Sequence, residues 1–498
     1  MENIMLGFSQ VLMPANLLAL TLGVLAGVVV GSLPGLNDSI ALAVLIPVTF
    51  GMDAKVAMCL LVGIYVSACY GGSIPAVLLK IPGTASSVVT AIDGHEMTKK
   101  GQAGLALSIS TTSSVVGGII SSVVLLFFSP FLAEQALKFG PPEYFMLAVM
   151  GLCTVIGMAE GQILKNIMVM SFGLLLSCIG FSPQTGFQRM TFGNPYLLEG
   201  IPLVPMLIGL FGAASVLELA ASKEKITNIT GNIKQVRVQL LDKEMRRRLL
   251  PTWAHSGVIG TLIGIIPGAG MLMAIYLAYD QAKRRNRSLD FGTGVPEGIA
   301  AAETANNAVV ASSMVPLLAL GVPGNSTSAL FLGALTIQGL RPGPSLYTDF
   351  PDVAYLLVTA FLAANLLMLP IGIGFCNFLA GKILRLRREV LSGAVLILCV
   401  SGAFAVSNSI FNIWIVIIFG IIGFFMNKFH LPQSPLILAV VLGSMMEKNF
   451  LQSMVLSDSS WSIFVTRPIS LVLVLLSAGF VLSPVIKKAG SRRKNGRG

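Results

Sequence analysis

Two short segments combine a helix breaker with hydroxyl groups in apolar surroundings. Residues 80–87 read KIPGTASS, and residues 322–328 read VPGNSTS. A Pro-Gly break leaves backbone N–H groups free at the start of one half-helix and C=O groups free at the end of another. The N–H groups suit a carboxylate, whereas the C=O groups, together with Ser, Thr and Asn oxygens, suit a small cation. Both segments are therefore candidate binding sites for a carboxylate and a small cation.

The candidate substrate ligands are the polar side chains in and beside these two segments. They are Thr84, Ser86, Ser87, Asn325, Ser326, Thr327, Asn306, Asn307 and Lys80. Lys80 has two functional interpretations: it pairs with a substrate carboxylate as a point charge, or it replaces a coupling cation. The alternative is that Lys80 reaches the cytoplasmic interface along its apolar stem.

Two carboxylates lie near the same elements and are the candidate cation ligands. Asp38 follows an earlier Pro-Gly pair, and Glu303 lies in ETANN (303–307). Ionisable groups at membrane depth are costly and tend to be functional. The candidate cation-binding residues are Asp38, Asn37, Glu303 and Ser328, with Na⁺ or H⁺ as coupling ion and no other metal or cofactor. The alternatives are capping or interfacial roles for the two acids, and ordinary helix packing for the small residues.

The chain that must position these residues has the composition of a polytopic membrane protein. Of its 498 residues, 54% are hydrophobic and 11% are charged, and the mean hydropathy is +0.83. A soluble globular domain carries about 25% charged residues. Since each span needs roughly 20 apolar residues, about ten to twelve spans fit. We therefore predict an all-α polytopic membrane protein.

Other function classes find little support in the sequence. The net charge of +11 is concentrated in short polar segments, as in cytoplasmic loops, so no nucleic-acid partner is expected. The six cysteines lie in apolar runs without metal-ligand spacing and are interpreted as small buried side chains. No catalytic dyad or metal set occurs on the predicted spans, so the protein is not expected to be an enzyme.

The chain also repeats itself. Residues 73–88 (SIPAVLLKIPGTASSV) align with residues 314–329 (MVPLLALGVPGNSTSA) at an offset of 241. Residues 31–39 (GSLPGLNDS) align with residues 264–272 (GIIPGAGML) at an offset of 233. Two such pairs in the same order indicate an internal repeat. Inverted repeats with broken helices are typical of secondary transporters, whose sites lie near the membrane midplane.

Corresponding loops of the two halves have opposite charge bias. Residues 93–101 carry two lysines, whereas their counterpart, residues 339–352, has one Arg and two Asp. Under the positive-inside rule, the halves insert upside down relative to each other. We therefore predict two inverted-topology repeats with re-entrant Pro-Gly hairpins. The predicted organisation is a first transmembrane repeat (1–220), a basic cytoplasmic linker (221–250), a second inverted repeat (251–460), and a final span with a basic cytoplasmic tail (461–498).

Several motifs resemble those of one transporter family. The sequence is similar to the large membrane subunit of the tripartite tricarboxylate transporters, a resemblance that covers nearly the whole chain. The matching motifs are Gly31 to Leu36, Tyr70 to Ile74, Ile81 to Thr84, Asp93 to Gly101, Glu303 to Asn307, Pro316 to Gly324 and Gly339 to Pro344. This chain departs from the family pattern at Pro75, Lys80 and Ser182-Pro183.

The resemblance implies a multi-pass importer in the bacterial inner membrane. Its substrate would be a di- or tricarboxylate such as citrate, driven by a cation gradient and moved by alternating access. Its implied partners are a small membrane subunit and a periplasmic solute-binding protein. The alternative function is an ion or anion channel, which would need a continuous polar pore.

Overall fold

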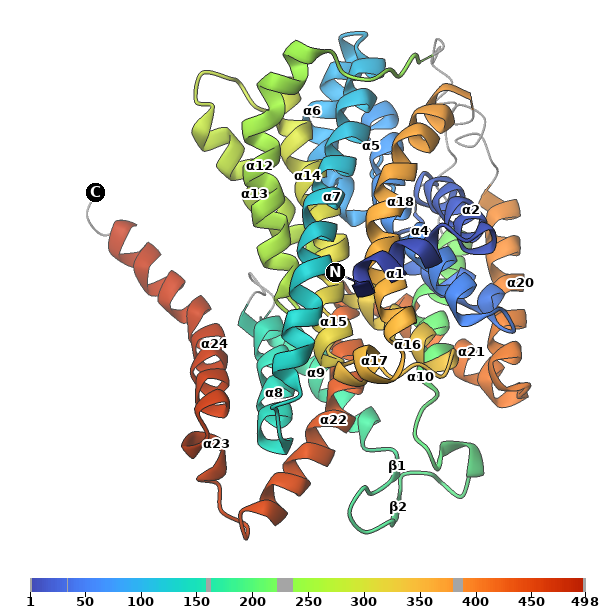
Figure 1. Ribbon diagram of the computed structural model, residues 1–498, viewed down its shortest axis with the longest axis vertical. Coiled ribbons are helices and arrows are strands. Elements are labelled where there is room, and N and C mark those ends of the chain that lie inside the picture. Colours follow the sequence, from blue (N-terminus) through green and yellow to red (C-terminus); the bar gives the residue numbers. More distant parts are fainter. Residues whose placement is uncertain (1, 34, 158–162, 222–235, 379–387, 496–498) are drawn as a thin grey trace.

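The chain folds almost entirely into α-helices (Figure 1). In the computed structural model, the described residues are 2–33, 35–157, 163–221, 236–378 and 388–495. Among them the only strands are β1 (Gly180–Phe181) and β2 (Gln188–Arg189), which pair antiparallel. The predicted all-α class is therefore confirmed.

Seven of the described helical segments are long and apolar enough to cross a membrane. They are Pro14–Gly31, Ala54–Leu79, Ala103–Ala136, Leu203–Ala221, Pro351–Phe378, Ile410–Lys428 and Ser434–Leu456. Shorter apolar helices are Asp38–Thr49, Pro141–Ile156, Ile163–Ser177, Ser326–Ile337, Ser392–Ser407 and Pro468–Leu482. The chain is a multi-pass membrane protein. The predicted ten to twelve spans require some of the shorter helices to cross as well, and this number stays a prediction.

The described helices fall on either side of the predicted linker. Those before the predicted linker are α1 (Glu2–Val11), α2 (Pro14–Gly31), α3 (Asp38–Leu45), η1 (Ile46–Thr49), α4 (Ala54–Gly71), α5 (Ser73–Leu79), η2 (Ala85–Ser87), α6 (Val88–Lys99), α7 (Ala103–Ala136), α8 (Pro141–Gly157), α9 (Ile163–Ser177), η3 (Pro195–Leu197), α10 (Leu203–Leu207), η4 (Ile208–Ala213) and α11 (Ala214–Ala221). The later ones are α12 (Lys243–Ile265), α13 (Met271–Arg285), α14 (Pro296–Ser312), α15 (Met314–Leu320), α16 (Ser326–Ile337), α17 (Pro344–Asp349), α18 (Pro351–Phe378), α20 (Arg388–Ser407), α21 (Ile410–Lys428), α22 (Ser434–Leu456), α23 (Ile463–Thr466) and α24 (Pro468–Asn495).

Parts of the predicted organisation fall outside the described residues. These are residues 1, 34 and 158–162 of the first repeat, residues 222–235 of the linker, residues 379–387 of the second repeat and residues 496–498 of the tail. Helix α12 begins at Lys243, so the helix that opens the second half starts inside the predicted linker. The other domain boundaries stay predictions.

Each Pro-Gly segment forms a hairpin that leaves the interior and returns to it. Helix α5 ends at Lys80 and α15 ends at Gly321, both in the left-handed region, with φ of 59° and 75°. After each, the chain runs back so that the glycine of the Pro-Gly pair lies against the residue that precedes the short helix, which is Gly72 for α5 and Ser313 for α15. Gly83 N donates to Gly72 O at 3.1 Å, and Gly324 O accepts from Gly268 N, in the break between α12 and α13, at 2.8 Å. Helices α6 and α16 then lead outward again.

The two glycines of these hairpins are required by close backbone approach. A Cβ atom on Gly83 would lie 2.6 Å from Gly31 O, and one on Gly324 would lie 2.7 Å from Ser313 O. Real Cβ atoms essentially never approach a heavy atom below 3.0 Å. The Pro-Gly pairs therefore allow the returning chain to dock on the interior ends of α2, α5 and α15.

The hairpins lie toward opposite ends of the molecule. Figure 1 shows α5 and α6 in the upper part, and α16 and α17 in the lower part. The inverted repeat and the orientation of each half in a membrane stay predictions. Helices α8, α9, α22 and α24 pack together on one side of the central helices, and α10, α11, α20 and α21 on the other.

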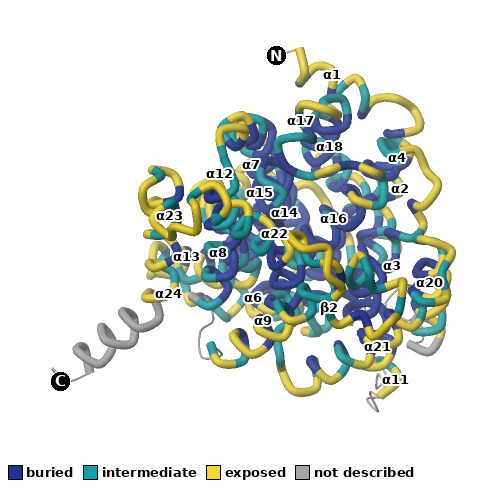
Figure 2. The backbone as a smooth tube through the Cα atoms, turned by 90° about the horizontal axis from the view of Figure 1, so that it is seen from below, coloured by how far each residue is buried: buried dark blue, intermediate teal, exposed yellow. Residues whose placement is uncertain are grey.

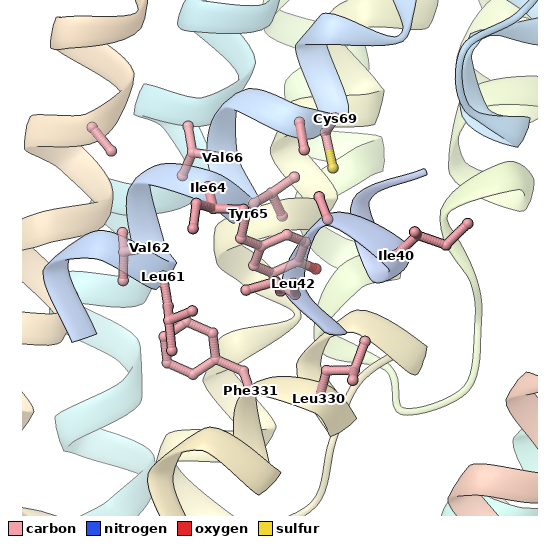
Figure 3. Close-up of a cluster of buried hydrophobic side chains, with 14 of the residues drawn as sticks. Ile40, Leu42, Leu61, Val62, Ile64, Tyr65, Val66, Cys69, Leu330 and Phe331 are labelled. Atoms are coloured by element: carbon pink, nitrogen blue, oxygen red, sulfur yellow. The ribbon is translucent and has the colours of Figure 1, made fainter. Parts of the chain in front are cut away.

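The interior is built around α14, whose residues from Glu297 to Ser312 are all buried (Figure 2). Apolar side chains of α3, α4 and α16 pack side by side in the neighbouring core (Figure 3). The labelled members are Ile40, Leu42, Leu61, Val62, Ile64, Tyr65, Val66, Cys69, Leu330 and Phe331. Since Asp38 lies on α3 and Thr327 on α16, this packing holds polar residues of both halves beside each other.

Candidate functional site

The first polar cluster joins the helix break of the first half to the hairpin of the second. Asp38 begins α3 and is 9% exposed. The Thr327 hydroxyl donates to Asp38 Oδ2 at 2.6 Å. Ser39 Oγ lies 2.8 Å from Thr327 Oγ1 and 3.4 Å from Ser326 Oγ. Because a threonine hydroxyl has one proton, Ser39 must donate to Thr327. We call Asp38, Ser39, Ser326 and Thr327 the Asp38 cluster.

Three predicted ligands beside this cluster act as helix caps. Asn37 caps α3 and accepts a hydrogen bond from Ile40 N at 2.8 Å. Asn325 caps α16: its Oδ1 accepts from Ser328 N at 2.7 Å, and its own N donates to Ser328 Oγ at 2.8 Å. Such a reciprocal capping box satisfies backbone donors that the helix start leaves free. Sequence reasoning did not foresee this use of Asn325 and Ser328.

The Asn325 side chain also connects the second hairpin to α4. Its Nδ2 donates to the Tyr65 hydroxyl at 3.0 Å, and that hydroxyl lies 3.0 Å from Ser313 Oγ. Tyr65 was missed at the sequence level because it sits in an apolar run. The repeat could have found it, since adding the offset of 241 to position 65 gives Asn306.

The second polar cluster is built from the opposite combination of halves. Glu303 lies on α14 and is fully buried. Thr90 on α6 donates to its Oε1, and Ser114 on α7 donates to its Oε2 at 2.8 Å. We call Glu303, Thr90 and Ser114 the Glu303 cluster. The two hydroxyl residues were missed because no motif singles them out, although Thr90 follows the hydroxyl-rich first hairpin closely.

The two clusters are related by their origin in the chain. Asp38 belongs to the first half and receives Thr327 from the second; Glu303 belongs to the second half and receives Thr90 and Ser114 from the first. Among the described residues, no ion pair includes either carboxylate. Cys69 on α4 contacts the helix that carries Glu303, because its backbone O accepts from Asn306 Nδ2 at 3.3 Å.

Beside Glu303, α14 carries buried polar atoms that have no hydrogen-bond partner within the described part of the chain. They are Thr304 Oγ1, Asn306 Oδ1, and both Oδ1 and Nδ2 of Asn307. More than nine in ten buried polar groups in proteins are paired, and leaving one unpaired costs about 1–3 kcal/mol. A concentration of such groups on one helix is therefore a sign of ligand binding.

The hydroxyl groups of the first hairpin form their own buried group. Thr84 Oγ1 lies 2.8 Å from Ser86 Oγ and 2.6 Å from Ser87 Oγ. Their segment, η2, packs against α13 and α14 of the second half. The structure thus places these predicted ligands near α14, but no hydrogen bond in the described residues joins them to the Asp38 cluster.

Lys80 lies apart from all these residues. It is exposed, at the outer end of the hairpin, where Thr98 Oγ1 donates to Val77 O at 2.9 Å. The pKa of the half-buried Glu96 carboxyl is lowered, chiefly by the hydrogen bond from Lys99 and to a lesser extent by the charge of Lys80. The structure therefore places Lys80 on the surface, and its role stays a prediction.

Asp93 is a further residue of interest that sequence reasoning left without a role. It is buried on α6, and its Oδ1 accepts hydrogen bonds from the backbone N atoms of Gly292, Gly294 and Val295 at 2.8–2.9 Å. Tyr279 donates to its Oδ2 at 2.7 Å. Through these hydrogen bonds, Asp93 connects α6, which follows the first hairpin, to the loop that precedes α14.

The chain is similar to one protein family and to individual known proteins. The model of the family described as "Tripartite tricarboxylate transporter TctA family" matches residues 17–438. Two relatives from Agrobacterium vitis are similar. The "Uncharacterized 52.8 kDa protein in TAR-I ttuC' 3'region" is 34% identical over 493 residues, covering 99% of this chain and 97% of its own. The "Uncharacterized protein in TAR-II ttuC' 3'region" is 31% identical over 235 residues, covering 47% and 97%. No solved structure matches the chain.

Proposed function

Because the chain belongs to the tripartite tricarboxylate transporter TctA family, we propose that it is the large membrane subunit of a secondary active importer. It would move a citrate-like di- or tricarboxylate across the bacterial inner membrane by alternating access. Membership makes the chain a component of a tripartite transporter, which implies partner subunits. The partners proposed here are a small membrane subunit and a periplasmic solute-binding protein.

The observation that carries the proposal is the reciprocal pairing of the two carboxylates. Each half contributes a buried acid, and the other half contributes the hydroxyl donors that reach it. Irregular backbone at membrane depth is tolerated where it is buried in protein or lines a cavity, and the sites of transporters with broken helices lie at such places. A site built from both halves changes whenever the halves move relative to each other.

The buried carboxylates support a cation as coupling partner. Hydroxyl donors stabilise a carboxylate but do not neutralise its charge, and an unpaired charge in a protein interior is strongly unfavourable. Na⁺ is bound by oxygen ligands of the kind that the Asp38 cluster offers, and H⁺ would bind either carboxylate directly. The proposed cation ligands are Asp38 and Glu303, with the hydroxyl groups around them.

The free polar groups of α14 support a binding site for the substrate. Asn307 offers an N–H donor and an oxygen acceptor without a partner among the described residues, and Asn306 adds an oxygen. Thr84, Ser86 and Ser87 lie on a segment that packs against the same helix. We assign the substrate carboxylates to this region between η2 and α14, where amide and hydroxyl donors can replace the water that the substrate loses.

Reconstitution tests the proposal. The protein, its small membrane subunit and the cognate binding protein would be placed in proteoliposomes, and uptake of radiolabelled citrate would be measured with imposed Na⁺ and pH gradients. We expect uptake that depends on a gradient and on the binding protein, with counterflow of labelled substrate when unlabelled substrate is inside. Conductance without counterflow would refute the carrier and indicate a channel.

A further inference from the structure

A cavity of about 190 Å³ lies between α12 and α13. Polar side chains form most of its lining: Arg248, Thr252, His255, Ser256, Gln281, Arg285 and Asn286. The other lining residues are Pro251, Ala278 and Ala282. Residues three, four and seven positions apart share one face of a helix. The cavity is therefore a groove between two helix faces, kept open by small side chains.

The charge of this groove is positive because only one of its arginines is neutralised. Arg248 binds the buried Glu297 through two hydrogen bonds, of 2.6 and 2.9 Å. Arg285 has no ion pair with any described carboxylate. Its partner is His255, whose Nδ1 lies 2.8 Å from Pro251 O.

The direction of these hydrogen bonds follows from the groups involved. A carbonyl oxygen only accepts, so His255 Nδ1 donates to Pro251 O. His255 Nε2 then faces the Arg285 guanidinium. One N–H of Arg285 is used in this way, and its other N–H groups remain for a ligand in the groove.

Apolar side chains continue the groove away from its charged end. Val258 and Leu262 follow His255 by three and seven residues and are 53% and 60% exposed. Leu277 precedes Gln281 by four residues and is 46% exposed. Figure 1 shows α12 and α13 at the periphery of the molecule. A charged pocket followed by an exposed apolar strip matches a lipid headgroup and its acyl chains.

Further basic residues surround the same end of the molecule. Lys283 and Arg284 precede Arg285 on the last turn of α13, and Lys100 donates to Thr293 O at 2.5 Å nearby. The charge bias of the sequence predicts that this end faces the cytoplasm, where the membrane leaflet carries anionic lipids. Basic pockets between membrane helices on this side bind phosphate headgroups.

We propose that the groove between α12 and α13 binds the phosphate group of an anionic phospholipid. Arg285 is the principal donor to the phosphate, Gln281 and Asn286 add neutral hydrogen-bond donors, and the acyl chains lie along Val258 and Leu262. Since α12 packs on α14, the lipid would stabilise the helix that carries Glu303. The site is independent of the substrate and the coupling ion.

The test measures the thermal stability of the purified protein in detergent during lipid titration. Phosphatidylglycerol should raise the Tm in a saturable way, whereas phosphatidylcholine should leave it unchanged. Arg285→Gln should weaken the apparent affinity for phosphatidylglycerol about tenfold, the loss expected for a charge-assisted hydrogen bond. The matched control is Arg284→Gln, which removes the same charge from an arginine paired with Asp280 outside the groove, and should shift the affinity less than twofold.

A second variant keeps the test decisive if Arg285→Gln does not fold. Gln281→Glu changes an exposed lining residue and places a negative charge in the groove, so it should also weaken phosphatidylglycerol binding. Equal affinity for the two lipids, or equal losses in Arg284→Gln and Arg285→Gln, would overturn the proposal. So would an equal Tm rise with inorganic phosphate alone, because the groove would then take the free anion rather than a lipid.

Discussion

Replacing Asp38 by Asn tests whether Asp38 binds the coupling cation or only stabilises the fold. The amide keeps the size of the side chain and an oxygen acceptor for the Thr327 hydroxyl, but it removes the charge. If Asp38 binds the coupling cation, Asp38→Asn should raise the cation concentration needed for half-maximal uptake. Its thermal stability should not fall, because a neutral amide replaces a buried carboxylate without an ion-pair partner among the described residues.

The expected size of the effect follows from the charge that is lost. A contact with a charged group in a protein contributes about 1.5–3 kcal/mol. Since 1.4 kcal/mol corresponds to a tenfold change in affinity, the half-saturating cation concentration should rise roughly 10- to 150-fold. The assay is citrate uptake into proteoliposomes at graded Na⁺ concentrations and at graded external pH, so that the two coupling ions are distinguished.

A matched control is available in the same half of the chain. Asp53 caps α4 at an exposed position, its Oδ1 accepting from Lys55 N at 2.9 Å, so Asp53→Asn changes the net charge equally. Its cation dependence should remain that of the parent protein. The reasoning is refuted if Asp38→Asn keeps the parent dependence on both ions, or if it lowers the Tm, because Asp38 would then act in folding rather than in coupling.

Three further predictions concern the substrate region, the hairpins and the topology. Asn307→Ala should lower uptake at least tenfold at parent-like stability, because it removes two buried polar atoms without partners in the described residues; a large drop in Tm would contradict a ligand role. Gly324→Ala should destabilise the fold by about 1–3 kcal/mol, because its Cβ would lie 2.7 Å from a backbone carbonyl, whereas Gly374→Ala, with open space around it, should not lower the Tm. A membrane-impermeant thiol reagent should label Leu240→Cys only from the cytoplasm and Asp349→Cys only from the periplasm; the reverse pattern would exclude the predicted orientation.

The positions of the helix breaks could be predicted from the sequence because their causes are local. A Pro-Gly pair interrupts a helix wherever it occurs, and the repeated spacing showed that the break at Gly83 has a counterpart at Gly324. The partners of the buried acids could not be predicted in the same way. Thr327 reaches Asp38 across 289 positions of the chain, and no local pattern encodes a contact over that separation.

The position of Lys80 shows that residues close in the sequence can lie at different depths. Lys80 is three residues from Gly83, which docks in the interior, and the sequence left open whether the lysine faces the same region or reaches an interface. Three residues can span up to about 10 Å, however. Because α5 ends at Lys80 and the chain only then turns back, the lysine marks the outer end of the hairpin and the glycine its inner end. The distance in space between two residues of a hairpin therefore depends on where its helical arm ends. The residue types alone did not predict that α5 ends at Lys80.

Under the proposed function, the reciprocal pairing gives a physical reason for coupling between ion and substrate. A ligand can shift a conformational equilibrium only through a difference in its affinity for the two states. When one half moves against the other, the hydroxyl group of Thr327 moves relative to Asp38, and Thr90 and Ser114 move relative to Glu303. Each carboxylate then has a different set of donors in the two states, so a cation bound there favours one of them. Because Asn306 and Asn307 lie on the same rigid helix as Glu303, the substrate region changes in the same motion, and each ligand must alter the affinity for the other by the same factor.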